Sequence, residues 1–162
     1  MMSSVMRHER LVYLNCGEGY NLLGEGVTDA TVAANAKTAE KQFIHQRMAS
    51  SGLSGYAPVL SFTAEMQTAD PAMLYLQELA DNLDYGVNAH TDIVIVDTWK
   101  KGNEEGAFAA RKIPVVISFD NPGSSAAGVE LAITGSMTYE GELTVGQWDP
   151  KTKEFTESVA SN

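Results

Sequence analysis

The chain has 162 residues, of which 44% are hydrophobic and 20% are charged. That length suits one domain with a sizeable core, and that composition excludes a wholly disordered chain. Twenty-one acidic against eleven basic residues give a formal net charge of −10, which argues against a protein that grips nucleic acid through lysine and arginine. The single cysteine, Cys16, excludes an internal disulfide framework, and the longest aliphatic run, residues 93–96, is too short to span a membrane.

The first clear strand signal covers residues 56–66, where Leu60, Phe62 and Ala64 alternate with polar residues. Alternation with period two predicts a strand that has one buried face and one wet face.

A helix is predicted next, at about residues 71–82. Asp70 can cap its first amides, and Pro71 suits the first helical position because no donor is lost there. Apolar residues between positions 73 and 83 form a one-sided stripe, so the helix is expected to pack on a sheet.

The second half of the chain is dominated by strand patterns. A longer hairpin loop is predicted at residues 121–128, which are rich in Gly, Pro and Ser. The strands are predicted at residues 91–99 and 113–119, both apolar on two faces as in central strands, at 131–139, and in a terminal hairpin of 143–148 with 154–156.

Together these signals predict a mainly β (α+β) fold: a β-sandwich or barrel with one flanking helix, in a single domain over residues 1–162.

No segment carries the signature of a catalytic, cofactor or metal site. The glycine-rich stretch at residues 17–26 has Glu25 where a phosphate-binding loop needs lysine. His8, His45 and His90 lie far apart in the sequence, and Cys16 has no second thiol with which to bind a metal. We therefore expect a protein that is not an enzyme and uses no cofactor or metal.

Acidic residues stand among serine and threonine on the wet faces of the predicted strands, at Glu65, Glu130, Glu140 and Glu142. One interpretation is a solvated face that keeps the protein soluble. The other is the lining of a passage for a polyanion, which like charges would repel.

Three stretches of the sequence carry a resemblance to a known family. They are residues 12–38, with VYLN, EGYNLLGEG and Asn35, Lys37 and Thr38; residues 110–128, with ARKIPV and DNPGSSAAG; and residues 133–156, with ITGSMTYEG and GQWDPKTKEFT. Over nearly its whole length the chain resembles the major tail tube protein of tailed bacteriophages and phage-derived tail-like particles.

The resemblance implies a fold and a task. The implied fold is a β-sandwich or barrel of tail-tube type flanked by a helix. Subunits of the family form hexameric rings, in which four strands from each copy join into one barrel around a lumen. The rings stack into a tube through which DNA leaves the capsid. The implied location is the virion tail, assembled in the host cytoplasm.

The resemblance also implies partners. These are further copies of the chain, a tape measure protein that fills the lumen during assembly, tail terminator or completion proteins and, in a contractile tail, a sheath. DNA is expected to pass through the lumen without specific binding, and no membrane partner is expected.

Three sets of residues follow from the resemblance. In the family a long loop between two early strands reaches a neighbour; residues 46–55 match it as a flexible inter-subunit loop, which makes Gln46, Arg47 and Met48 the inter-subunit candidates. Residues 1–10 are expected to be a flexible N-terminal arm that orders on assembly. The lumen-facing candidates are Ser61, Thr63, Glu65, Glu130, Thr134, Ser136, Thr138 and Glu140.

Two other hypotheses stay open. One is a different structural protein of the same kind of particle, such as a tail terminator, a sheath-associated protein or a capsid-decorating protein. The other is a small β-sandwich that binds carbohydrate, which would present an exposed aromatic platform. Trp99 and Trp148 fall within or at the end of predicted strands, which argues against such a platform.

Overall fold

The computed structural model describes residues 2–158. Met1 of the expected arm and residues 159–162 of the expected domain lie outside the described residues. The strands are β1 (Arg10–Asn15), β2 (Tyr20–Leu22), β3 (Val27–Ala33), β4 (Ala36–Lys41), β5 (Ser50–Tyr56), β6 (Val59–Glu65), β7 (His90–Lys101), β8 (Phe108–Ser124), β9 (Ala132–Tyr139), β10 (Thr144–Asp149) and β11 (Glu154–Glu157). One α-helix, α1 (Pro71–Asn82), and two 3-10 turns, η1 (Arg7–Glu9) and η2 (Gly86–Ala89), complete the described part of the chain.

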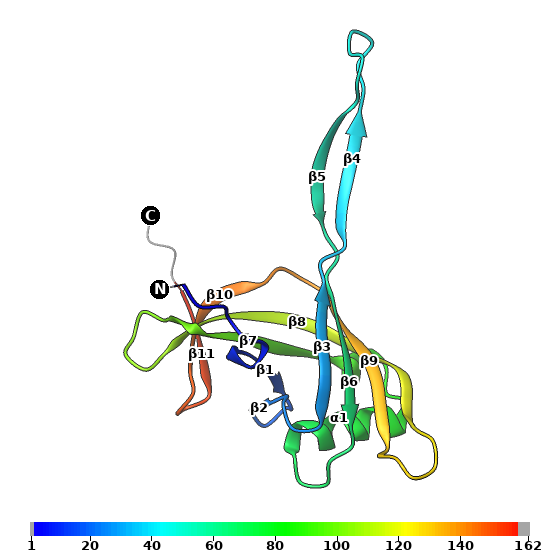
Figure 1. Ribbon diagram of the computed structural model, residues 1–162, viewed down its shortest axis with the longest axis vertical. Coiled ribbons are helices and arrows are strands. Elements are labelled where there is room, and N and C mark those ends of the chain that lie inside the picture. The colour runs from blue at the N-terminus through cyan, green and yellow to red at the C-terminus, as the bar shows by residue number, and fades with distance from the viewer. Residues whose placement is uncertain (1, 159–162) are drawn as a thin grey trace.

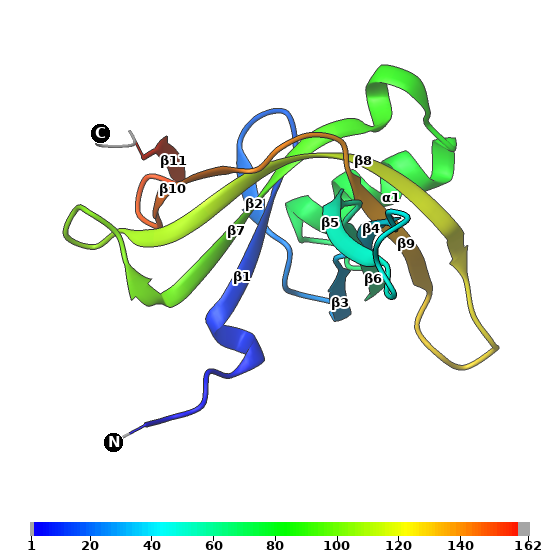
Figure 2. The ribbon, with the colours of Figure 1, turned by 90° about the horizontal axis from the view of Figure 1, so that it is seen from above.

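Most strands belong to one antiparallel sheet in the order β2-β1-β7-β8-β9-β6-β3. Viewed from above, this sheet curls into an open half-barrel (Figure 2). The long strand β8 is its centre: the first half pairs with β10, and the second half pairs with β9. The terminal hairpin of β10 and β11 is present as predicted. The expectation of a mainly β fold with one flanking helix is confirmed.

A separate two-stranded hairpin, made of β4 and β5, extends far from the body of the molecule (Figure 1). Its strand β4 continues from the end of β3, and its strand β5 leads into the start of β6. The hairpin therefore marks one end of the sheet. We call this the hairpin end. The loop between β8 and β9, the chain before β3 and the loop after β6 lie at the opposite end.

Helix α1 spans the residues predicted from the sequence. The Asp70 side chain accepts a hydrogen bond from the Ala72 amide (3.2 Å), and Pro71 occupies the first turn. Leu83 ends the helix in the left-handed conformation. The helix packs against β8 and β2.

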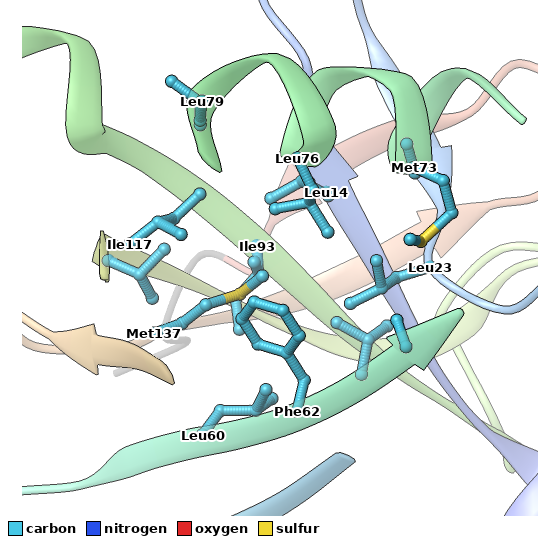
Figure 3. Packing of buried hydrophobic residues seen from close by; sticks show 14 of the residues in the cluster. Leu14, Leu23, Leu60, Phe62, Met73, Leu76, Leu79, Ile93, Ile117 and Met137 are labelled. Atoms are coloured by element: carbon cyan, nitrogen blue, oxygen red, sulfur yellow. The ribbon is translucent and has the colours of Figure 1, made fainter. Parts of the chain in front are cut away.

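The main core lies between α1 and one face of the sheet (Figure 3). Met73, Leu76 and Leu79 of the helix face alternate side chains of the strands, among them Phe62 and Met137. Each such side chain contributes about 1.5–3 kcal/mol when it is removed from water. The period-two apolar pattern therefore fixes which face of the sheet turns inward.

A second, smaller core covers the reverse face of β1 and β7. Val94 and Val96 of β7 pack there with Tyr13 and the fully buried Trp148, whose ring lies 4.4 Å from that of Tyr13 between centroids. Because the neighbouring side chains of β7 belong to the main core, this strand is buried on both faces. The prediction of a central strand is confirmed.

Two segments predicted as loops are strand in part. Residues 121–124 belong to β8, which continues past irregularities in its pairing with β9 before the chain turns. Residues 50–55 belong to β5, because their backbone groups pair with β4 despite their serine and glycine content. In the expected N-terminal arm, Arg7–Glu9 form η1, and Arg10 is already the first residue of β1.

At Gly135 in β9 the main core leaves no room for a side chain. A β-carbon there would lie 2.4 Å from the Ser118 carbonyl oxygen and 3.1 Å from the Phe62 ring. Phe62 and Phe119 are both register partners of this glycine, and their rings meet edge to face. The two rings occupy the space that a side chain at position 135 would need.

We expect Gly135→Ala to lower the free energy of unfolding by about 1–3 kcal/mol, because the added methyl group overpacks the core. The matched control is Gly52→Ala in β5, where a β-carbon meets nothing within 4 Å. Urea unfolding followed by tryptophan fluorescence measures both variants. Equal stability of the two would contradict this account of the core.

Candidate assembly surfaces

The reverse of the main core, over β3, β6, β9 and part of β8, is a largely polar surface that also holds Val59, Val116 and Ala132. Register pairs such as Ser61 with Ser136, and Ser118 with Ser136, place their side chains on one face. The Ser118 and Ser136 hydroxyl oxygens are 3.1 Å apart. We call this surface the polar face; its members are Asp29, Thr31, Ser61, Thr63, Glu65, Ser118, Thr134, Ser136 and Thr138.

Six of the eight lumen-facing candidates lie on the polar face, namely Ser61, Thr63, Glu65, Thr134, Ser136 and Thr138. Its two charged members, Asp29 and Glu65, are both acids, and it carries no lysine or arginine. Asp29, Thr31 and Ser118 were missed at the sequence level. They join the polar face through the register between neighbouring strands, which the sequence of a single strand does not reveal.

The other two candidates lie beyond the ends of β9. Glu130 is exposed in the loop before the strand, at the end of the sheet opposite the hairpin. Glu140 follows the strand, and its carboxylate lies 2.6 Å from the His90 ring. The alternation of polar and apolar residues continues in the sequence from Glu130 to Glu140, but the strand itself covers only residues 132–139.

Strand β3 is a free edge of the sheet. The Glu65 amide donates to the Gly26 carbonyl, so odd-numbered residues of β6 direct their backbone groups toward β3. Because hydrogen-bonded and non-bonded pairs alternate, Thr31 bonds to β6, whereas Ala30 and Val32 direct their backbone groups outward. No described strand pairs with that side.

The second half of β8 is the other free edge of the polar face. Strand β7 begins at His90, opposite Val116, so it does not accompany the later residues of β8. The Glu140 amide donates to the Pro114 carbonyl, which directs even-numbered residues of β8 toward β9. Ile117 and Phe119 therefore direct their backbone groups to the side where no described strand lies.

The hairpin of β4 and β5 presents apolar side chains to solvent. Phe43, Ile44 and Met48 at its tip are 58%, 107% and 81% exposed, and Leu53 and Tyr56 are also exposed. The inter-subunit candidates Gln46, Arg47 and Met48 all lie in this turn. Phe43 and Ile44 were missed, although two large apolar residues beside a polar turn were a readable signal. A cluster of this kind on a projecting arm is typical of a contact surface.

Residues 2–158 hold no cluster of His, Cys, Asp or Glu able to bind a metal ion. Burial raises the pKa of the Cys16 thiol, which keeps it protonated and weakly nucleophilic. None of the helices in that part of the chain is long and apolar enough to cross a membrane.

The two tryptophans do not form an exposed platform. Trp148 is fully buried, and the Arg10 guanidinium lies 5.3 Å from the centre of the Trp99 ring. The carbohydrate-binding hypothesis therefore loses the feature that it requires.

The fold has counterparts among solved structures, although no family model and no curated protein matches the sequence. A chain from the virion of a native gene transfer agent (GTA) particle matches the structure with a TM-score of 0.62 and 13% identity, over 88% of this chain and 98% of that chain. This chain therefore shares its fold with a chain of that particle.

Two further solved structures agree with that assignment. A chain from the tail of an empty GTA particle, determined with C6 symmetry, has a TM-score of 0.58 and 11% identity, over 87% of this chain and 98% of that chain. A chain from the six-fold symmetrised baseplate of the anti-feeding prophage has a TM-score of 0.52 and 13% identity, over 90% of this chain and 97% of that chain. The resemblance expected from the sequence is confirmed at the level of the fold.

The direction of the β3 backbone generates a prediction about proline. Val32→Pro removes an amide that faces away from β6, so we expect the free energy of unfolding to fall by less than about 1 kcal/mol. Thr31→Pro removes an amide that bonds to β6 and leaves the Ser61 carbonyl without its donor, which costs about 1–3 kcal/mol. Urea denaturation of both variants measures the difference, and the reverse order would show that the edge assignment is wrong.

Proposed function

We propose that this chain is a structural subunit of a phage tail or tail-like particle that polymerises as stacked hexameric rings into the tail tube. The observation that carries the proposal is the polar face: a strip of four strands, free at both edges, in a fold shared with a C6-symmetric tail. The chain is proposed to act by assembly, without catalysis or a cofactor.

Ring closure would satisfy the two free edges. The outward backbone groups of Ala30 and Val32 in one copy would pair with those of Ile117 and Phe119 in the next copy. The Ala30 carbonyl already accepts a bond from the Arg7 guanidinium (3.2 Å), and its second lone pair would serve the neighbouring strand. Unpaired strand edges are templates for another strand, and a rotation that closes on itself ends the series without leaving any edge. The four strands of each copy would then form part of one continuous barrel.

The polar face would line the lumen of that barrel, with Ser61, Thr63, Glu65, Thr134, Ser136 and Thr138 toward the passing polymer. Hydroxyl groups and carboxylates without lysine or arginine neutralise no phosphates, so DNA would gain nothing from binding to the wall. Glu130 and Glu140, at the two ends of β9, would lie near the mouths of each ring.

The hairpin of β4 and β5 would reach from one copy to a neighbour. Its exposed apolar tip has no core of its own to enter, and burial of Phe43, Ile44 and Met48 against another copy would stabilise the stack. Gln46 and Arg47 lie in the same turn. Of the expected flexible segments 1–10 and 46–55, the parts outside η1, β1 and β5 would take their final arrangement in the assembly.

The tube role implies further partners. These are a tape measure protein within the lumen during assembly, terminator or completion proteins at the end of the tube, and a sheath if the tail contracts. The location is the virion tail, with assembly in the host cytoplasm.

A second candidate is a tail structural protein at one end of the tube, such as a terminator or a sheath-associated protein. The match to a chain from a baseplate structure favours it, because a chain of this fold is found in that assembly. A repeated unit grows into long tubes, whereas an end protein stops at a ring.

The proposed function is tested by negative-stain microscopy of the concentrated protein. We expect wild-type protein to form hollow rings and tubes, and Val32→Pro to remain monomeric because proline removes a donor from the joining edge. Rings that never lengthen would favour the end protein. A wild-type protein that stays monomeric even with a tail-tip complex present would contradict both candidates.

The lumen assignment predicts that Ser61→Lys with Thr138→Lys makes assembled tubes retain short duplex DNA, in a form protected from nuclease and released by salt. The matched control, Gln77→Lys with Asn82→Lys on α1, adds the same charge away from the polar face. DNA bound to the control is expected to be digested. Equal protection in both variants would show that the polar face does not line the lumen.

A further inference from the structure

A basic pocket of about 370 Å³ lies at the hairpin end of the sheet. Its walls include the last residues of β3, the start of β6 and the end of β9, since all three strands meet the hairpin end there. We call it the arginine pocket; the residues that matter for its chemistry are Arg7, Arg10, Val32, Leu60, Arg111 and Tyr139.

Three of the four arginines of the chain line this pocket, although the chain is strongly acidic. One carboxylate, that of the buried Asp97, serves two of them: it lies 2.7 Å from Arg10 Nε and 3.4 Å from Arg111 Nη2. The side chains of Arg10 and Arg111 are still 44% and 32% exposed. A guanidinium has five N–H donors, so both retain capacity for another acceptor.

The third arginine has no acidic partner among the described residues. The Arg7 guanidinium donates to the carbonyl oxygens of Arg10 (2.7 Å) and Ala30 (3.2 Å). Burial raises the pKa of the Tyr139 hydroxyl, and the charges of Arg111 and Arg10 act in the opposite direction, as expected for cations that face it. With three cations and one anion, the pocket has an excess of positive charge.

The opposite end of the same three strands is acidic. Glu25 precedes β3, Glu65 ends β6 and Glu130 precedes β9. None of them is ion-paired within residues 2–158, and Glu25 and Glu130 are exposed. At the hairpin end Glu140 follows β9, and its carboxylate is paired with His90. The two ends of these three strands therefore differ: arginines with spare donors line the hairpin end, and unpaired glutamates stand at the opposite end.

We propose that the arginine pocket binds a carboxylate from the acidic end of a second copy, so that the copies stack in one direction only. This inference rests on the proposed tube function. Guanidinium groups bind carboxylates through paired, charge-assisted hydrogen bonds. Two copies meeting by like ends would place cations against cations or acids against acids, which disfavours the reversed stack.

The occupant is a protein carboxylate and not DNA, because of where the pocket opens. Val32 and Leu60 lie on the core side of β3 and β6, the reverse of the polar face. A polymer that passes along the polar face does not reach these arginines. A side chain that enters from the end of the sheet does.

The test uses three charge reversals, a fourth as the control, and a complementation assay. Arg7→Glu is chosen because Arg7 donates only to backbone carbonyls, so the buried Asp97 keeps both of its partners. We expect Arg7→Glu to form rings but to need about tenfold or more protein to stack into tubes. Glu130→Lys and Glu25→Lys are compared in parallel. Lys151→Glu, in the exposed turn after β10, makes the same charge change as Arg7→Glu and should stack like the wild type.

Complementation distinguishes a contact between copies from damage within one copy. Rings of Arg7→Glu mixed with rings of Glu130→Lys or Glu25→Lys are expected to form tubes at wild-type concentration, because alternating rings restore opposite charges at every junction. Normal stacking of Arg7→Glu alone, or failure of both mixtures, would overturn the inference. Absence of rings from the wild-type protein would instead refute the proposed function.

Discussion

The backbone pairing of β8 is the constraint on which the rest of the structure depends. Its first half is held by β7 and β10, and its second half by β9. Since β7 begins opposite Val116, the sheet narrows to four strands beyond that point and acquires an unpaired side. The offset leaves an open half-barrel with matching edges at β3 and β8 (Figure 2).

The two faces of this four-strand region follow from one side-chain alternation. Leu60, Phe62 and Ile133 turn toward α1, so their neighbours in the chain must turn the other way. A shift of one residue in register would bury the serines and threonines and expose the core. The packing that stabilises the core therefore also fixes the position and orientation of the polar face.

The sequence was sufficient where a local signal and a buried face coincide. The bounds of α1 were predictable because Asp70 and Pro71 define its start, and β7 because its residues are apolar on both faces. The hairpin of β4 and β5 was not, since an arm without a core needs no apolar alternation and its serines and glycines read as loop. The arginine pocket was equally invisible. Arg10 and Arg111 meet at Asp97 only through the registers of β1, β7 and β8, which join residues far apart in the chain.

The net negative charge of the molecule opposes association through its free strand edges and its exposed apolar hairpin tip. A subunit with free edges and an exposed apolar tip is prone to join other copies indiscriminately, and the net charge of −10 opposes this through mutual repulsion. That repulsion is not uniform, because the arginines gather at one end of the sheet and unpaired glutamates at the other. In the proposed stack, most orientations of two copies would be repulsive, while an approach of the acidic end toward the arginine pocket would be attractive within a Debye length of about 8–10 Å at moderate salt. Charge would then select the orientation, and burial of the apolar hairpin tip would stabilise the contact afterwards.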